Sequence, residues 1–184
     1  MSELEGRVQA VCISAMNSDE DLLKFPQPSV EVGPFGFNGD RHAGAYRTKV
    51  VEKRGSGYSL RFEVDVFNDR QVTVVSREVV DEISRDLGIS IAPGGLGENV
   101  LVEGLGDLSS LSLGDELRFR GGVRLRIMGQ NEPCVKINRY HGQVVKKIHG
   151  RRGVLAMVTI PGKIEAGDGV IIVRRRAEFS EDKI

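Results

Sequence analysis

Short runs of β-branched residues separated by glycines limit the fold of this chain more than any other feature of its sequence. Glycine makes up 23 of the 184 residues, well above the roughly 7% of an average soluble protein. Frequent tight turns between short strands are typical of a β-barrel or β-sandwich. Gly121 and Gly122 predict a hairpin between two of the runs. Eight runs read as strands: residues 7–14, 59–67, 71–76, 98–104, 115–120, 123–129, 154–160 and 169–175.

Two stretches with helical periodicity interrupt the strands. In residues 77–88 the apolar side chains recur every three or four positions, after a capping serine and before Gly88. Residues 132–148 predict a second helix, capped by Asn131, which Gly142 can break or kink. Strands and helices do not alternate regularly, which argues against a parallel sheet. We therefore expect an antiparallel β-barrel with a few peripheral α-helices.

Charge and composition argue against several classes of partner. The chain has 26 basic and 26 acidic residues, so no long-range positive field draws it to nucleic acid or to an anionic membrane. No apolar stretch approaches the roughly 18 residues needed to span a bilayer. Two unlike cysteines do not form a disulfide framework, which is typical of a cytoplasmic protein. We expect one domain over residues 1–174 and a charged tail over residues 175–184.

Cys134 has the sequence context of a reactive thiol, and Cys12 that of a buried one. Cys12 lies in an apolar strand, where a small hydrophobic side chain packs well. Cys134 falls in the first turn expected for the second helix, where unpaired amides and the helix dipole favour a thiolate. Lys136 and Arg139 add positive charge nearby. A lone cysteine is more often structural, so the local context leaves the two readings of Cys134 evenly balanced.

A second polar cluster lies in residues 37–44, which read FNGDRHAG. If residues 40–42 are extended, Asp40 and His42 share one face, and the carboxylate orients the ring and holds its charged form for acid–base chemistry. Arg41 then points the other way. The alternative is a polar turn in which Asp40 caps backbone amides, and taken alone this alternative is favoured. The three histidines of the chain show no recognisable metal-ligand spacing.

Glycine-flanked residues supply two further candidates. The three glycines in residues 93–100 can expose amides to an anion, with Glu98 and Asn99 as polar contacts. A glycine cluster without a Walker lysine is more often a plain turn. Arg151 and Arg152 can clamp a phosphate, although exposed basic turns are common.

The order of these motifs resembles the MOSC domain family, which is named for the C-terminal part of molybdenum cofactor sulfurases. Six of them follow one another from about residue 6 to residue 174: GDRHAG, VTVVSREVVDEI, GGLGENVLVEG, LSLGDELRF, EPCVKI and RRGVLAMVTIPGKIEAGDGVIIV. The resemblance implies a β-rich barrel with a cavity for a pterin-type molybdenum cofactor. Residues 45–70 depart from the family in being long and charged, and we interpret them as an extra hairpin rather than as a lid or a partner surface.

The resemblance also assigns expected roles to residues. Cys134 matches the cysteine that carries sulfur as a persulfide or meets molybdenum directly. Asp40 and His42 match the family's acid–histidine motif, and with Cys134 they are the expected catalytic residues. The residues expected to bind the cofactor are Arg41, Gly97, Glu98, Asn99, Asn131, Lys136, Arg151 and Arg152.

Three functions fit this resemblance. The favoured one is a stand-alone sulfur carrier that binds a molybdopterin-type cofactor and transfers sulfur through Cys134. The second is a molybdenum-dependent reductase of N-hydroxylated substrates, with Cys134 as the metal ligand, and the third is a non-catalytic cofactor chaperone or sensor. The first two need a partner protein as sulfur donor, sulfur acceptor or electron source. A barrel without a small-molecule site is the remaining alternative.

Overall fold

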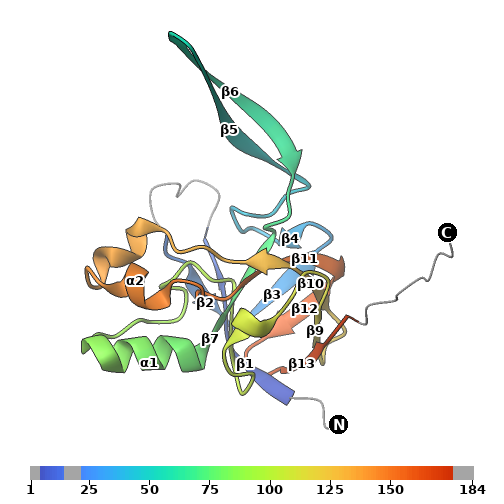
Figure 1. Ribbon diagram of the computed structural model, residues 1–184. Coiled ribbons are helices and arrows are strands. Elements are labelled where there is room, and N and C mark those ends of the chain that lie inside the picture. The colour runs from blue at the N-terminus through green and yellow to red at the C-terminus, as the bar shows by residue number, and fades with distance from the viewer. Residues whose placement is uncertain (1–4, 15–21, 176–184) are drawn as a thin grey trace, which may run out of the picture.

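The computed structural model describes residues 5–14 and 22–175, and Figure 1 shows a β-barrel with its two α-helices on one side. The strands are β1 (Glu5–Ile13), β2 (Phe25–Gln27), β3 (Ser29–Gly33), β4 (Gly36–Phe37), β5 (Tyr46–Gly55), β6 (Tyr58–Phe67), β7 (Val72–Ser76), β8 (Val100–Glu103), β9 (Glu116–Phe119), β10 (Arg124–Gln130), β11 (Val154–Ile160), β12 (Gly162–Glu165) and β13 (Gly169–Val173). The α-helices are α1 (Arg77–Leu87) and α2 (Val144–Ile148), and the 3-10 helices are η1 (Leu108–Ser110) and η2 (Val135–Arg139).

Seven strands form a closed ring in the order β13-β9-β10-β11-β7-β8-β1, and β13 pairs again with β1. The expected mainly β barrel with few helices is therefore confirmed, but the expectation of a purely antiparallel barrel is wrong. Strands β7 and β8 pair in parallel. Helix α1 lies between them in the chain and makes the crossover that a parallel pair requires. A single such unit does not produce the repeated strand–helix pattern by which a parallel sheet is recognised.

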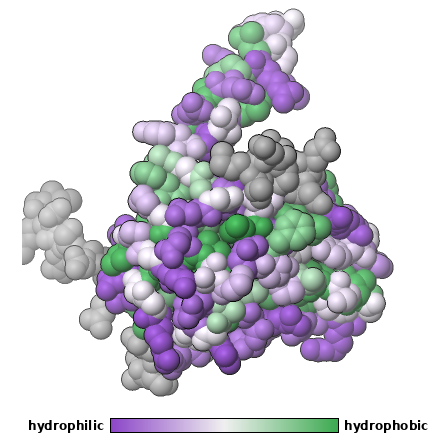
Figure 2. Space-filling model, turned by 180° about the vertical axis from the view of Figure 1, so that it is seen from behind, coloured by the Kyte–Doolittle hydropathy of each residue, from purple (hydrophilic) through white to green (hydrophobic). Residues whose placement is uncertain are grey.

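Residues outside the ring form smaller sheets. Strand β2 pairs with β1, and β12, β3 and β4 form a three-stranded sheet. The hairpin expected at Gly121 and Gly122 joins β9 to β10, and Gly122 has the positive φ of 91° that such a turn needs. Residues 45–70 contain the expected extra hairpin, β5–β6, which projects from the barrel with apolar and hydrophilic side chains mixed on its surface (Figures 1 and 2).

The helix expected over residues 132–148 is two short pieces, η2 and α2. The break spans residues 140–143 and includes Gly142, as expected. Asn131 does not cap a helix, because Cys134 occupies the N-cap position of η2. Helix α1, in contrast, begins and ends where the sequence predicts: Ser76 accepts a hydrogen bond from the Val79 amide, and Gly88 closes the last turn with φ 63°.

Two apolar cores lie on the two sides of the barrel wall. Strand β1 contributes to both: Val8 and Val11 pack inside the barrel, while Ala10 and Cys12 pack in the cluster that includes α1 and α2, and an irregularity between Val8 and Ala10 shifts the alternation. Cys12 is fully buried, as its apolar context predicts, and this burial raises the pKa of its thiol to about 12. Of the charged tail expected over residues 175–184, all but Arg175 lies outside the described residues.

Two glycines with the same backbone conformation allow a test of barrel packing. Gly153 and Gly122 both have φ 91°, but a Cβ at Gly153 would overlap the Val74 carbonyl oxygen, whereas a Cβ at Gly122 would meet nothing within 4 Å. Gly122→Ala should lower the free energy of unfolding by about 1–2 kcal/mol, the cost of the left-handed conformation alone. Gly153→Ala should lower it by about 1–3 kcal/mol more, because β7 must shift. Equal losses in urea unfolding would contradict this account of the packing.

Candidate functional site

A buried ion pair joins the segment before β2 to the turn after β4. Lys24 Nζ lies 2.8 Å from Asp40 Oδ1, and both side chains are fully buried. The two carboxylate oxygens of Asp40 also accept hydrogen bonds from the Ser14 and His42 amides, each at 3.0 Å. One carboxylate therefore connects the end of β1, the start of β2 and residues 38–44.

Lys24 and Asp40 both stay charged because their attraction for each other opposes the cost of burying the two charges. Burial favours a neutral Asp40, but the Lys24 charge and the hydrogen bonds from Lys24, His42 and Ser14 outweigh it and keep the pKa of the carboxyl below its usual value. Burial acts more strongly on Lys24 and lowers the pKa of its ammonium to about 8, although Asp40 opposes the shift. At neutral pH the pair is therefore charged.

The His42 ring is neutral, which corrects the expectation that Asp40 holds it charged. Burial, followed by the nearby Lys24 ammonium, lowers the pKa of His42 to about 4. Residues 40–42 form a turn rather than an extended strand, and Asp40 Oδ1 bonds the His42 backbone while its distance to His42 Nδ1 is 3.7 Å. Lys24 Nζ lies 3.2 Å from that Nδ1. Since an ammonium only donates, Nδ1 accepts from Lys24 and the ring proton lies on Nε2.

A cavity of about 230 Å³ lies next to this network. It contains three arginines but no carboxylate among its lining residues. Thr73 and Gly97 reach it from the barrel wall, and Asn131, the predicted cofactor-binding residue that follows β10, lines it as well. The complete lining consists of Leu22, His42, Arg47, Arg70, Thr73, Gly97, Asn131, Arg152 and Leu155.

Arg152 is the most buried charge in this cavity, with 6% of its surface exposed. Its two terminal nitrogens donate to the carbonyl oxygens of Glu132 and Leu96, at 2.6 and 2.7 Å. Its Nε is buried and has no hydrogen-bond partner among the residues that the structure describes. Burial lowers the pKa of Arg152, and electrostatic attraction to Cys134 and Glu98 opposes the shift. A buried guanidinium that meets carbonyl oxygens and has a spare donor is suited to an anion.

Cys134 lies two residues after Glu132, the residue whose carbonyl holds Arg152. Its thiol is free and half-buried, and it lies within electrostatic range of Arg152. The expected helical first turn is not present, because Cys134 precedes a five-residue 3-10 helix and has extended backbone angles. Arg152 brings positive charge within electrostatic range of Cys134, and Lys136 is exposed on η2 and does not line the cavity.

Two amides of the glycine loop bind a carboxyl group of their own chain, whereas Gly97 of the same loop lines the cavity. The amides of Gly94 and Leu96 donate to the fully buried carboxyl of Glu98, at 2.7 and 3.0 Å. Burial nevertheless raises the pKa of Glu98. Asn99 is equally buried, and its side chain bonds Thr73 and the Cys12 carbonyl across three strands. Both residues support the cavity wall, and neither lines the cavity.

Arg151 and Arg41 also lie outside the cavity lining. The Arg151 guanidinium makes two hydrogen bonds to Glu82 of α1, at 2.8 and 2.7 Å, and one to Asp107, at 2.8 Å. These bonds raise the pKa of Arg151 and attach its turn to α1. Of the two arginines expected to clamp a phosphate, Arg152 alone lines the cavity. Arg41 donates to the Leu22 carbonyl at 3.2 Å and supports the segment before β2.

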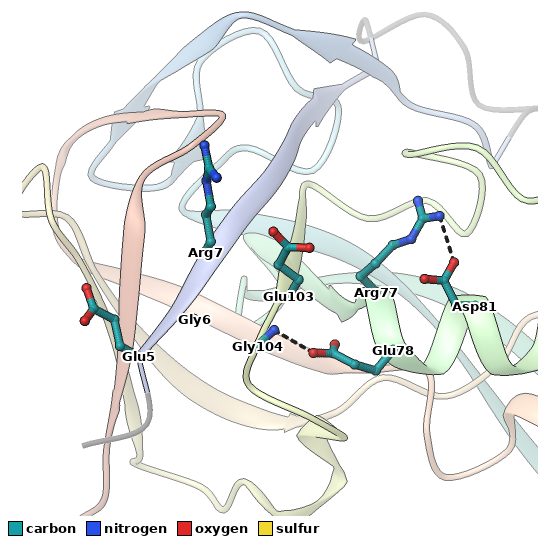
Figure 3. A pocket seen from close by; sticks show the side chains of 8 residues that line it. All are labelled: Glu5, Gly6, Arg7, Arg77, Glu78, Asp81, Glu103 and Gly104. Atoms are coloured by element: carbon teal, nitrogen blue, oxygen red, sulfur yellow. Dashed lines mark hydrogen bonds and ion pairs between the residues drawn. The ribbon is translucent and has the colours of Figure 1, made fainter. Parts of the chain in front are cut away.

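A larger hollow of about 470 Å³ contains none of the residues selected from the sequence. Figure 3 shows that acids and bases mix in it: Arg77 pairs with Asp81 at 2.7 Å, and Glu78 accepts from the Gly104 amide. Its lining consists of Glu5, Gly6, Arg7, Arg77, Glu78, Asp81, Glu103 and Gly104. Because its bases are matched by at least as many acids, we assign the candidate site to the smaller cavity, whose described lining residues include three arginines and no carboxylate.

Two searches of the described residues gave no candidates. Residues 5–14 and 22–175 contain no group of three or more His, Cys, Asp or Glu side chains placed to hold a metal ion. Over the same ranges, no helix has the length and apolar character to cross a membrane.

Sequence reasoning missed Lys24, Arg47 and Arg70. Lys24 had a recognisable signal, because it is a lone charge between Leu23 and Phe25. Arg47 is the second residue of β5 and Arg70 follows β6, so both lie within the segment interpreted only as an insertion. Their place in the cavity follows from the fold and not from a local pattern.

Comparison with known proteins gives the family. The MOSC domain matches residues 39–171 of this chain. The chain belongs to the MOSC domain family. A relative from Bacillus subtilis (strain 168) is named "Putative metal-sulfur cluster biosynthesis proteins YuaD", and it is 34% identical over 161 residues, which cover 78% of this chain and 82% of that protein.

Three crystal structures share the fold described above. The YuaD protein of Bacillus subtilis has a TM-score of 0.78 and 28% identity, covering 95% of this chain and 99% of the YuaD chain. YiiM from Geobacillus stearothermophilus has a TM-score of 0.66 and 19% identity, with 92% and 76% covered. YiiM from Escherichia coli has a TM-score of 0.61 and 20% identity, with 94% and 72% covered.

The buried pair predicts coupled effects on stability. Lys24→Met leaves the Asp40 charge buried without its cation, and should lower the free energy of unfolding by about 3–5 kcal/mol at pH 7. Asp40→Asn added to Lys24→Met removes that charge, so the double variant should be more stable than Lys24→Met. Urea unfolding of both single variants and the double variant measures the coupling. Losses that simply add would show that the two groups do not depend on each other.

Proposed function

We propose that this MOSC protein binds the phosphate-bearing end of a molybdopterin-type cofactor in the 230 Å³ cavity and carries sulfur on Cys134. The observation that supports this most is Arg152, a buried cation with an unpaired Nε beside a free, half-buried thiol. A purely structural arginine is normally satisfied by its own protein. Arg152 instead lines the cavity while its buried Nε has no hydrogen-bond partner among the described residues.

The residues present fit the anionic end of such a cofactor. Arg152, Arg70 and Arg47 bring positive charge, and the neutral His42 directs no charge of its own against a metal or a sulfur atom. The cavity is smaller than the roughly 300–1,000 Å³ that encloses a whole drug-sized ligand, so its size suits a phosphate head group. When bound, the cofactor supplies a dithiolene-held molybdenum centre as the acceptor of sulfur.

Sulfur transfer at Cys134 needs no external oxidant or reductant. The Cys134 thiolate attacks the outer sulfur of a donor persulfide, and a new S–S bond forms on Cys134. The S–S bond of the donor breaks, and the donor thiolate leaves with its electron pair. The Arg152 guanidinium lies within electrostatic range of the attacking sulfur. The printed name of the YuaD relative, which refers to metal-sulfur cluster biosynthesis, supports a role in handling sulfur.

A reducing compartment is the natural setting for this chemistry. Cys12 and Cys134 are both free, and free thiols persist in the cytoplasm. The persulfide must come from another protein, so we include a donor protein among the partners and place the protein in the cytoplasm.

Mass spectrometry tests the carrier function. After incubation with a cysteine desulfurase and L-cysteine, Cys134 should gain about 32 Da, one sulfur atom, and lose it on reduction. Cys134→Ser should gain nothing, and Cys12→Ala, the matched control, should load like the unaltered protein. Absence of the adduct on Cys134 would contradict the carrier function. Stoichiometric molybdenum that copurifies and is lost in Cys134→Ser would favour the reductase instead.

A further inference from the structure

The β5–β6 hairpin is a two-stranded ribbon that leaves the barrel. Its strands pair over ten positions, from Tyr46 opposite Phe67 to Gly55 opposite Tyr58, and neither strand pairs with any other described strand. Figure 1 shows it projecting from the body of the molecule. An isolated hairpin is marginally stable in water. Its large side chains are also exposed: Tyr58 54%, Leu60 53% and Phe62 46%. A ribbon of this kind needs a partner to bury its apolar surface.

The register separates the hairpin into two unlike faces. Directly opposed residues share a face, and successive residues alternate. One face therefore carries an apolar stripe along β6 beside a basic column along β5. We call it the basic–apolar face, and its members are Arg47, Lys49, Val51, Lys53, Gly55, Tyr58, Leu60, Phe62, Val64 and Val66.

All the carboxylates of the hairpin lie on the other face. There Glu52 pairs with Arg54, and Asp65 accepts a hydrogen bond from Thr48. Tyr46, Val50 and Phe67 are exposed on this face but are interrupted by charged residues. The basic–apolar face has no acid of its own, so its lysines are available to the carboxylates of a partner.

The basic–apolar face continues into the candidate site. Arg47, the first residue of its basic column, lines the cavity and pairs with Asp69 at 3.2 Å. Asn68, which follows β6, donates to the carbonyl oxygens of His42 and Gly44 at 2.8 and 3.0 Å. The base of the hairpin is thus fixed to the turn that holds His42. A protein bound along this face therefore lies beside the cavity.

We infer that the basic–apolar face docks the protein that delivers sulfur to Cys134. This inference rests on the proposed carrier function. The partner is expected to present an apolar strip bordered by carboxylates, which matches the stripe of β6 and the column of β5. The hairpin then holds the donor protein beside the cavity, whose Arg152 lies within electrostatic range of Cys134, the residue that receives the sulfur.

Two other occupants fit the face less well. A second copy of this chain would bring either its basic column against the apolar stripe or lysines against lysines, because the face contains no acid. An anionic membrane would be met first by the tip of the hairpin, residues 55–58, which offers Tyr58 as its single large side chain, while Lys49 and Lys53 lie further from the tip. A protein with complementary charge meets neither difficulty.

The rate of sulfur loading tests the inference with two donors. The protein donor is the cysteine desulfurase from the same genome, supplied with L-cysteine, and the small donor is glutathione persulfide. The docking variants are Lys49→Glu with Lys53→Glu, and Leu60→Ser with Phe62→Ser. The matched control reverses two charges on the other face, Arg54→Glu with Arg61→Glu. Loading of Cys134 is followed by mass spectrometry over time.

Both docking variants should load from the desulfurase about tenfold more slowly, while the control stays within about twofold of the unaltered protein. Loading from glutathione persulfide should be unchanged in all of them. Added salt should slow only the protein donor. Loss of loading from both donors, or an equal loss in the control, would overturn the docking role.

Three further results would each overturn the inference. A dimer of the unaltered protein that the docking variants convert to monomers would overturn the inference in favour of a second copy. Binding to phosphatidylserine vesicles that the variants abolish, with desulfurase loading intact, would overturn it in favour of a membrane. If the unaltered protein accepts sulfur from neither donor, the proposed carrier function fails and the inference fails with it.

Discussion

A lysine and an aspartate that are both removed from water hold the candidate site together. Lys24 and Asp40 come from segments 16 residues apart, and their ion pair fixes the start of β2 against the turn that carries His42. Asp40 also accepts hydrogen bonds from two backbone amides, so protein groups replace much of the hydration that the pair loses on burial. Burial, and then the charge of the same lysine, lower the pKa of the His42 ring, and the lysine places the ring proton on Nε2. The position of His42 at the cavity depends on this fixed geometry.

Two neighbouring arginines have different surroundings: those of Arg151 suit support of the fold, and those of Arg152 suit binding of an anion. Arg151 is enclosed by Glu82 and Asp107, so its charge is fully used within the protein. Arg152 meets only carbonyl oxygens, is nearly buried, and keeps one donor unpaired. The glycine loop also supports the fold through these contacts, because its Gly94 and Leu96 amides already donate hydrogen bonds to Glu98. The cavity is thus cationic through Arg152 and its neighbours.

Local patterns predicted much of the fold, and the site less completely. Alternation and glycine turns located most strands of the ring, and the Ser76 cap and Gly88 located α1. The parallel β7–β8 pair escaped prediction because it depends on which strands meet in space. The motif around Asp40 was found, but its partner Lys24 was not, since the pairing is a tertiary contact between a turn and a distant segment. Arg151 and Arg152 are adjacent and alike in sequence, and only their surroundings separate their roles.

Arg152 is expected to bind an anion, and thermal unfolding with pyrophosphate tests this binding most directly. The unaltered protein and Arg151→Met should both melt at higher temperature when pyrophosphate is added at constant ionic strength, because ligand binding stabilises the folded state. Arg152→Met should show no such rise. The same rise in Arg152→Met as in the unaltered protein, or no rise in any of them, would contradict the account.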